Sequence, residues 1–457
     1  MQTILDPQCN DLQLAERLGA MIRFRTVSDA DHAQIDRKAF LGLHAYLEQT
    51  YPLVHKHLSK TVINDYSLLY HWKGTGEGEQ KPLLLMAHQD VVPVSPGTED
   101  DWTHDGFSGA IADGCVWGRG AIDIKVMILG EMEAVEYLLS QGFTPKQDIY
   151  LAYGHDEELI GKDGCTRIAQ HLQQQGVELG MVLDEGGSFG KGERSGAPGQ
   201  LIASIGIFEK GYCDLQLTVQ DAGGHSSRPG ESTALGELAR AIDAIERSKF
   251  PPALPDPVRR FYQTLAPYLS DPALQHAAQV ADVDPQLLVQ WLSQTPRGNA
   301  LVRTTTAATQ AWASPAPNIL PQKAQAVFNF RLNPEQKVAD VLAHCQKAVD
   351  NPRVQLEVLK GNEPSAISDA DAPAFDMLRR TILSVAPQAV VTPSEVVGGT
   401  DSRNFCPMCR CVYRFSPFMG AMEYSSTVHA TNERIAVQGL GDGVTFFVRL
   451  IQNYQSM

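Results

Sequence analysis

An α/β fold is predicted, because short apolar strands alternate with amphipathic helices in the first part of the chain. The strand signals are the runs at 83–86, 148–153 and 181–183, and each is followed directly by acidic or histidine side chains. Helical patterns at 127–139 and 163–175 separate these runs, and each stops near a glycine. Strands and helices that alternate in this order form a mainly parallel sheet flanked by helices, which gathers ligands at the carboxyl ends of its strands.

The pattern changes after Phe208 and predicts an inserted α+β domain. Residues 212–219 and 324–332 alternate as half-exposed strands, and 233–247 has the period of an amphipathic helix. The stretch 251–298 between them is rich in Pro, Gln and Ala and is long enough to hold further helices. It is interpreted as a cover or as an interface.

The earlier pattern returns after Asn333 and Pro334, where helices are predicted at 338–349 and 437–454. A length of 457 residues exceeds what one hydrophobic core usually holds, which agrees with two domains. The predicted organisation is a first domain divided into 1–208 and 336–457 around an insertion at 209–335.

Composition excludes several classes of function. A formal charge of −15 repels a phosphate backbone, and no basic stripe with interleaved aromatic residues offsets it, so nucleic acid is not an expected partner. Residues 1–10 lack a basic start and an apolar run, and no long apolar segment follows, so neither a signal peptide nor a membrane span is expected. The eight dispersed cysteines are typical of reduced thiols, and we expect a cytoplasmic protein.

Candidate metal ligands follow the three predicted strands. His88 and Asp90 follow the first, 156–158 follow the second and 184–185 follow the third, while Asp123 lies after a glycine-rich segment. Imidazole and carboxylate ligands suit zinc or a neighbouring divalent ion, and several carboxylates offset the charge of a pair of such ions. The sequence therefore predicts a two-metal hydrolase.

Each candidate also has an interpretation without a metal. His88 alone could be a strand-end histidine, and Glu157 with Glu158 is typical of the first turn of a helix. Asp123 could cap a helix that begins at Ile124. The order in which these motifs occur favours metal binding.

Six ordered motifs resemble one known family over almost the whole chain. The motifs are His88–Asp90, Trp117–Gly120 with Asp123 and Lys125, Asp156–Glu158, Asp184–Gly186, Gly224–Pro229, and Asn318 with Pro321, and they are followed by His429. The sequence resembles the dizinc exopeptidases and amidohydrolases that include aminoacylase-1, succinyl-diaminopimelate desuccinylase, glutamate carboxypeptidase and carboxypeptidase S. Within this family it is most similar to the branch of carboxypeptidase S and the N-acyl-amino-acid hydrolases.

The resemblance implies a zinc-exopeptidase-like catalytic domain at 1–208 and 336–457, with the insertion at 209–335 as a lid or dimerisation domain. It also implies two zinc ions, with cobalt or manganese as substitutes, and a homodimer through the insertion. The implied ligands are His88 and His429, one for each ion, Asp123 between them, Glu158, and either Glu185 or Asp184. Neighbouring residues of a strand point in opposite directions, so the choice between the two acids stays open.

Glu157 is implied as the general base and Asp90 as an acceptor for the imidazole of His88. A two-metal centre needs one carboxylate that is not a ligand, because the bound water, with its pKa lowered from about 15.7 toward roughly 7, must lose a proton. Asp90 would fix the tautomer of His88 and raise its basicity.

Further residues are implied in substrate binding. His225 resembles the residue that contacts the scissile carbonyl oxygen, often from the partner subunit. Asn318 and Arg331 resemble positions that hold the substrate, and Arg331 is suited to a free carboxylate. Arg403 offers a further positive charge to an anionic substrate.

The predicted function is hydrolysis of an amide bond beside a free carboxylate, releasing an amino acid from a short peptide or an N-acyl-amino acid. Both a carboxypeptidase and an aminoacylase agree with the residues. Two alternatives come from other classes: a non-catalytic metal-binding scaffold, and a two-metal phosphoesterase. An intact Glu157 argues against the scaffold, because such a protein has no need of an acid that is not a ligand.

Overall fold

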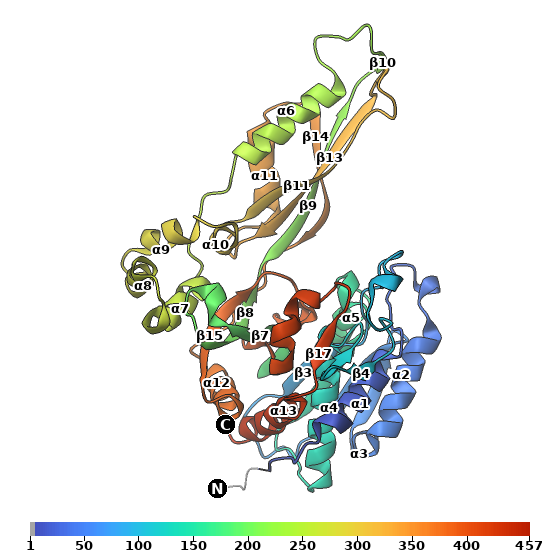
Figure 1. Ribbon diagram of the computed structural model, residues 1–457, viewed down its shortest axis with the longest axis vertical. Coiled ribbons are helices and arrows are strands. Elements are labelled where there is room, and N and C mark those ends of the chain that lie inside the picture. Colours follow the sequence, from blue (N-terminus) through green and yellow to red (C-terminus); the bar gives the residue numbers. More distant parts are fainter. Residues whose placement is uncertain (1–4) are drawn as a thin grey trace. The chain divides into compact units, whose positions relative to one another are not determined.

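The computed structural model describes residues 5–457 and divides the chain into two compact units (Figure 1). Unit 1 comprises the chain up to Ile207 together with Ser368–Ser394 and Thr400–Met457. Unit 2 comprises Phe208–Ile367 and Glu395–Gly399. No helix among the described residues is long and apolar enough to cross a membrane.

Unit 1 is built on an eight-stranded sheet. In spatial order its strands are β1 (Ser59–Ile63), β2 (Ser67–Trp72), β6 (Ile149–Gly154), β3 (Leu83–His88), β7 (Met181–Lys191), β16 (Val412–Ser416), β8 (Leu201–Glu209) and β15 (Ala389–Val396). The ladders β6–β3, β3–β7 and β7–β16 are parallel, while β1–β2, β2–β6 and β16–β8 are antiparallel. The predicted α/β fold is confirmed, and the parallel part of the sheet is its centre.

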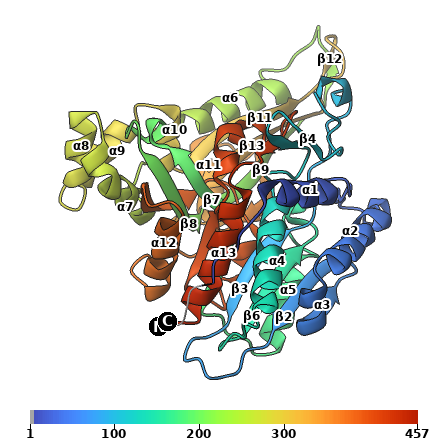
Figure 2. The same ribbon diagram turned by 60° about the horizontal axis from the view of Figure 1, so that its bottom comes forward.

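Helices cover both faces of this sheet (Figure 2). They are α1 (Asp11–Ile22), α2 (Arg37–Thr50), α3 (Pro52–His57), α4 (Lys125–Ser140), α5 (Cys165–Gln174), α12 (Pro373–Val385) and α13 (Leu440–Tyr454). Leu83 and Leu85 of β3 pack in one hydrophobic cluster with α4 and α13, whereas Leu84 and Met86 pack in another with α5. A strand buried on both faces needs an unbroken apolar run, which explains the sequence at 83–86.

A small second sheet of unit 1 links distant parts of the chain. It consists of β4 (Ala110–Ala112), β5 (Cys115–Trp117) and β17 (Arg434–Ala436), in the order β17-β5-β4. Both ladders are antiparallel, and β17 pairs with β5 through Arg434 and Trp117. The segment before α4 is thereby joined to the segment that follows His429.

Unit 2 contains a four-stranded antiparallel sheet of order β11-β13-β9-β14. Its strands are β9 (Gly211–Gln220), β11 (Thr305–Trp312), β13 (Lys323–Leu332) and β14 (Val354–Asn362), and β10 (Gly224–His225) pairs separately with β12 (Ile319–Leu320). Its helices are α6 (Ala234–Arg247), α7 (Asp256–Leu265), α8 (Pro272–Gln279), α9 (Pro285–Leu292), α10 (Pro296–Leu301) and α11 (Val338–Val349). Side chains of α6 and α11 share one hydrophobic core with β9 and β13.

The predicted return of the first domain at residue 336 was wrong, and unit 1 resumes only at Ser368. The helix predicted at 338–349 exists as α11, but its buried Val341 and Cys345 belong to the core of unit 2. The next strand, β14, pairs with β9 of the same unit. A helix followed by a strand occurs in both domains. The local pattern therefore does not indicate which sheet α11 and β14 join.

Candidate active site

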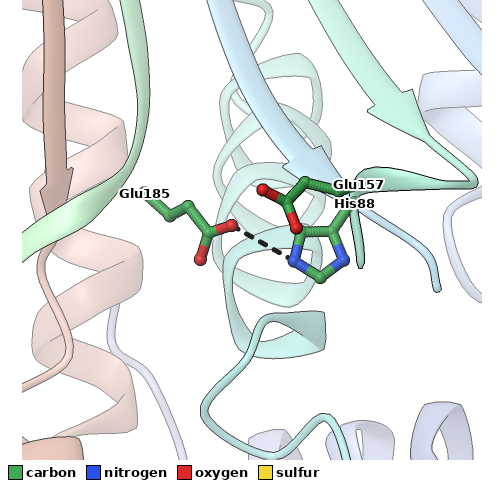
Figure 3. Close-up of side chains that lie close together, drawn as sticks. All are labelled: His88, Glu157 and Glu185. Carbon is green, nitrogen blue, oxygen red and sulfur yellow. Dashed lines mark ion pairs between the residues drawn. The ribbon is translucent and has the colours of Figure 1, made fainter. Parts of the chain in front are cut away.

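Three neighbouring parallel strands bring the first candidate ligands together. His88 is the last residue of β3, Glu185 lies on β7, and Glu157 begins a short 3-10 helix, η3 (Glu157–Leu159), just after β6. The Nε2 atom of His88 is 3.1 Å from Oε1 of Glu185, and Glu157 lies beside this pair (Figure 3). One potential ligand atom from each of the three residues lies within 4.8 Å of the others. The convergence is the one that the parallel order of the strands predicts.

Asp123 lies between the two histidines. Its Oδ1 atom is 3.1 Å from Nε2 of His88, and its Oδ2 atom is 3.0 Å from Nε2 of His429. The same His429 nitrogen is 3.1 Å from Oε2 of Glu158. Each histidine therefore meets one oxygen of Asp123 and one further carboxylate, which is Glu185 for His88 and Glu158 for His429.

This set of donors fits divalent cations. It contains the imidazoles of His88 and His429 and four carboxylates, those of Asp123, Glu157, Glu158 and Glu185. The Oε1 atom of Glu158 is buried and has no hydrogen-bond partner among residues 5–457. A buried carboxylate oxygen without a partner is costly, and a cation would remove that cost.

Burial and crowded negative charge perturb the acids of this cluster. Burial raises the pKa of Glu157 well above its ordinary value, and the charges of Glu185, Asp401 and Asp123 raise it further. Burial and the charge of Asp123 raise the pKa of Glu185 to about 8. Excess negative charge of this kind is what a bound cation offsets.

The pKa values of the two histidines are raised by their carboxylate partners. Hydrogen bonds with Asp123 and Glu158 raise the pKa of His429 to about 10. Burial opposes the charged form of His88, yet the charge of Glu185 and its carboxylate partners raise its pKa well above the usual range. Without a cation each histidine is therefore stabilised as an imidazolium, and a cation would take the place of that proton.

Asp90 contacts the site differently from the prediction. The nearest acceptor for Nδ1 of His88 is the carbonyl oxygen of Asp90, at 2.9 Å, while the carboxylate Oδ1 is 3.5 Å away. The carboxylate instead accepts hydrogen bonds from the backbone N–H groups of Glu157 and Glu158, each at 3.2 Å. Asp90 thus fixes both the imidazole of His88 and the turn that carries the two glutamates.

Asp184 and Glu185 have opposite surroundings. Asp184 is buried, and its carboxylate accepts hydrogen bonds from the backbone N–H groups of Ser402 and Glu185, both at 2.9 Å. Only the side chain of Glu185 reaches His88. The alternation of side chains along β7 therefore places Glu185 in the cluster and turns Asp184 toward the segment of Ser402.

Glu433 and Arg119 are constituents of the site to which the sequence assigned no role. Glu433 is fully buried and accepts hydrogen bonds from Arg119 and from backbone N–H groups next to and at Asp123. Arg119 stands in the motif Trp117–Gly120 and Glu433 follows His429 by four residues, but more than three hundred positions separate the two. A single sequence gives no signal that two such distant residues meet.

The remaining predicted site residues come from other stretches of the sequence. His225 is exposed on β10, with Nδ1 2.8 Å from the hydroxyl of Ser227, and the carbonyl of Asn318 accepts a hydrogen bond from Ser226. The guanidinium of Arg331 lies over the ring of Tyr212, 4.8 Å from its centroid. These residues belong to unit 2, and their roles stay predictions.

Arg403 belongs to unit 1 and lies in a short 3-10 helix, η6 (Asp401–Phe405). Its Nε donates to the carbonyl oxygen of Thr400 at 2.8 Å. Its contact with substrate also stays a prediction.

Comparisons with known proteins agree on one family. The family model described as "Peptidase family M20/M25/M40" matches residues 84–453. The chain is 35% identical, over 97% of its length and 85% of the relative's, to the "Probable carboxypeptidase S-like 2" of Dictyostelium discoideum. It is 36% identical, over 96% of its length and 86% of the relative's, to the "N-fatty-acyl-amino acid synthase/hydrolase PM20D1" of Xenopus tropicalis. Identity to the carboxypeptidase S of Saccharomyces cerevisiae is 29%, over 97% of this chain and 83% of that protein.

Solved structures share the fold. The M20 family metallo-carboxypeptidase Sso-CP2 from Sulfolobus solfataricus superposes with a TM-score of 0.70 at 17% identity, covering 98% of this chain and all of the other. Human carnosine dipeptidase 1 gives a TM-score of 0.67 at 13% identity, covering 98% of this chain and 97% of the other. At such identities the similarity concerns the fold alone.

Proposed function

Since the chain belongs to peptidase family M20/M25/M40, as a hydrolase of the carboxypeptidase S and N-acyl-amino-acid hydrolase type, we propose that it cleaves an amide bond beside a free carboxylate. The products would be an amino acid and either a carboxylic acid or a shorter peptide. Support comes from one observation above all: Asp123 offers one carboxylate oxygen to each of two histidines, and each histidine also meets a second acid.

The side chains present would hold two divalent ions. His88 and Glu185 would bind one, His429 and Glu158 the other, and Asp123 both, with zinc as the metal and cobalt or manganese as substitutes. When bound, such ions supply positive charge beside the scissile carbonyl and a water whose pKa falls from about 15.7 toward roughly 7.

Glu157 is the proposed general base. The contacts to the two histidines at 3.0–3.1 Å are made by the other three acids, while Glu157 stands within 4.8 Å of His88 and Glu185. Asp90 accepts a hydrogen bond from the backbone N–H of Glu157, which fixes the start of its turn. The Glu157 carboxylate would accept a proton from the attacking water and then donate it to the leaving nitrogen.

Recognition of the substrate is assigned to the arginines and to the exposed loop of unit 2. Arg331 would bind the free carboxylate, and Arg403 would offer a further positive charge to an anionic substrate. Asn318 would hold the substrate and His225 would donate to the carbonyl oxygen. The names of the relatives include both carboxypeptidases and an N-fatty-acyl-amino acid hydrolase, so short peptides and N-acyl-amino acids are the proposed substrates. A homodimer through unit 2 is part of the same proposal.

Release of free amino acid tests this function. The zinc-loaded protein is incubated with a panel of N-acyl-amino acids and dipeptides, beside a chelated sample and the Glu157→Gln variant. We expect release from at least one substrate class, loss of release on chelation, and a decrease of about 10²–10⁴-fold in the variant. Full activity in the chelated sample would contradict the metal-dependent mechanism.

Phosphate monoesters and diesters in the same panel test the phosphoesterase alternative. Turnover of these esters without release of any amino acid would replace the proposed function. A protein that binds zinc but hydrolyses no member of the panel would instead support the non-catalytic scaffold.

A further inference from the structure

Glu433 joins two segments that carry metal ligands from distant parts of the chain. It follows His429 by four residues, its side chain is fully buried, and its Oε2 atom is 2.6 Å from Nη1 of Arg119. Its Oε1 atom accepts three backbone N–H groups, those of Gly120 at 3.1 Å, Ile122 at 3.0 Å and Asp123 at 3.2 Å. These hydrogen bonds therefore fix the loop in which Asp123 lies.

The backbone strengthens this connection. The carbonyl of Glu433 accepts a hydrogen bond from the N–H of Gly118 at 2.8 Å, and the next residue begins the ladder between β17 and β5. Arg434 lies between two aromatic rings, 4.4 Å from the centroid of Trp117 and 4.6 Å from that of Tyr424. The segments around Asp123 and His429 are thus joined by side-chain and backbone hydrogen bonds.

The positions of the ligands in the two halves of the metal cluster depend on this hydrogen-bonded connection to different degrees. His88 ends a central strand, and its side chain is only 2% exposed, so the sheet itself fixes its position. His429 lies outside any strand, has a positive φ of 58°, and has a side chain that is 49% exposed. The sheet does not hold His429, which lies between the 3-10 helix η7 (Met419–Thr427) and the segment that Glu433 anchors.

We propose that Glu433 is a positioning residue that sets Asp123 against His429, so that the metal position of Asp123, Glu158 and His429 depends on it. The position of His88 and Glu185 depends on it less. The inference rests on the proposed metal-dependent function. Residues that orient metal ligands through hydrogen bonds typically change metal affinity by about 10–100-fold when they are replaced. A charged acceptor for three N–H groups and a guanidinium is such a residue.

Zinc binding to two variants tests this role. Glu433→Gln keeps the shape of the side chain but removes its charge, and the double variant Arg119→Met/Glu433→Gln also avoids leaving a buried unpaired arginine. Both stepwise zinc dissociation constants are measured by competition with a chromophoric chelator. We expect one of the two zinc dissociation constants to increase by about 10–100-fold in both variants, while the other changes by less than about two-fold.

Glu133→Gln is the matched control. Glu133 lies in the same unit and pairs with Arg17 at 2.5 Å and with the hydroxyl of Tyr51 at 2.9 Å, away from the metal cluster. This variant should lower Tm and leave both zinc constants unchanged, which separates a loss of stability from a loss of positioning.

The outcomes distinguish this inference from the function on which it rests. If the unaltered protein binds fewer than two zinc ions, the two-metal part of the proposed function fails. If it binds two, and the Glu433 variants show unchanged constants or an equal weakening of both steps, the positioning role is contradicted.

Discussion

Asp184 and Glu185 are neighbours on β7, yet only Glu185 reaches the cluster around His88. The backbone N–H of Ser402 holds the Asp184 carboxylate on the other side of the strand. The sequence predicted that the ligand would be one of these acids but could not choose between them, because the strand continues beyond residue 183 and its register is set by tertiary pairing.

Substitution of these two acids separates their roles. We expect Glu185→Gln to bind less than two equivalents of zinc, because it removes a ligand charge, and Asp184→Asn to retain both. Metal content after dialysis, measured by mass spectrometry, gives the comparison. The opposite pattern would assign the ligand to Asp184 and overturn the register described here.

The contact between Glu433 and Arg119 could not be predicted from single residues and their motifs. His88, Asp123, Glu157, Glu158 and His429 were recognisable from their motifs, and the structure brings their side chains together. Glu433 and Arg119 act only through a contact that spans most of the chain. Neither composition nor local residue spacing predicts such a contact.

At the scale of elements, the short helix η3 depends on a residue from another strand. Asp90, just after β3, accepts the N–H groups of Glu157 and Glu158, as an N-cap residue does at the start of a helix. The turn that carries the proposed general base is therefore capped by a carboxylate that is distant in the sequence. Asp36 provides a conventional comparison, because its side chain caps α2 through Lys38 and Ala39.

The two caps should differ in their effect on catalysis. We expect Asp36→Ala to lower the free energy of unfolding by about 0.5–2 kcal/mol and to leave kcat unchanged. Asp90→Ala should destabilise the protein at least as much and lower kcat by about 10–100-fold, because the turn of Glu157 loses its anchor. Denaturant unfolding and steady-state kinetics check both variants. Equal kcat values in the two variants would refute a catalytic role for this cap.

Most elements were predictable because their patterns are strong. The helices predicted at 127–139 and 338–349 and the strands predicted at 83–86 and 148–153 lie within a few residues of their observed bounds. The boundary at 335 failed for a different reason. Whether α11 and β14 join one sheet or the other is decided by long-range pairing with β9, which no local period reveals.

Across the whole molecule, the buried acids and histidines link stability to pH. In the metal-free protein the pKa of Glu185 rises from 4.5 to about 8 and that of His429 from 6.5 to about 10. The folded state then binds more protons than the unfolded chain. The stabilisation from Glu185 is complete below pH 4.5 and that from His429 below pH 6.5, and both are lost as pH rises through the raised values.

The Tm of the chelated protein should therefore fall relative to that of the zinc-loaded protein as the pH rises from 6.5 to 9. Bound metal replaces the protons, so the loaded protein loses less of this stabilisation. Thermal unfolding of both forms across that range gives the difference. A difference that shrinks with rising pH would show that the site does not exchange protons for metal.

The role of unit 2 in catalysis is testable through His225. We expect His225→Ala to lower kcat by about 10²–10³-fold, because it removes the proposed donor to the developing oxyanion, with zinc content unchanged. Ser232→Ala provides a control at a half-buried residue of unit 2 whose hydroxyl accepts a hydrogen bond from Arg240, and it should retain activity. An unaltered kcat in His225→Ala would remove this residue from the mechanism.

Restoring hydrolysis by adding zinc to the chelated protein tests whether the reaction depends on two bound ions and on Glu157. The rate of amino acid release is followed while zinc is added in fractions of an equivalent, for the unaltered protein and for Glu157→Gln. We expect the rate to reach its maximum at the second equivalent, while Glu157→Gln binds the same zinc and stays inactive. A rate that is already maximal without metal, or a fully active Glu157→Gln variant, would contradict it.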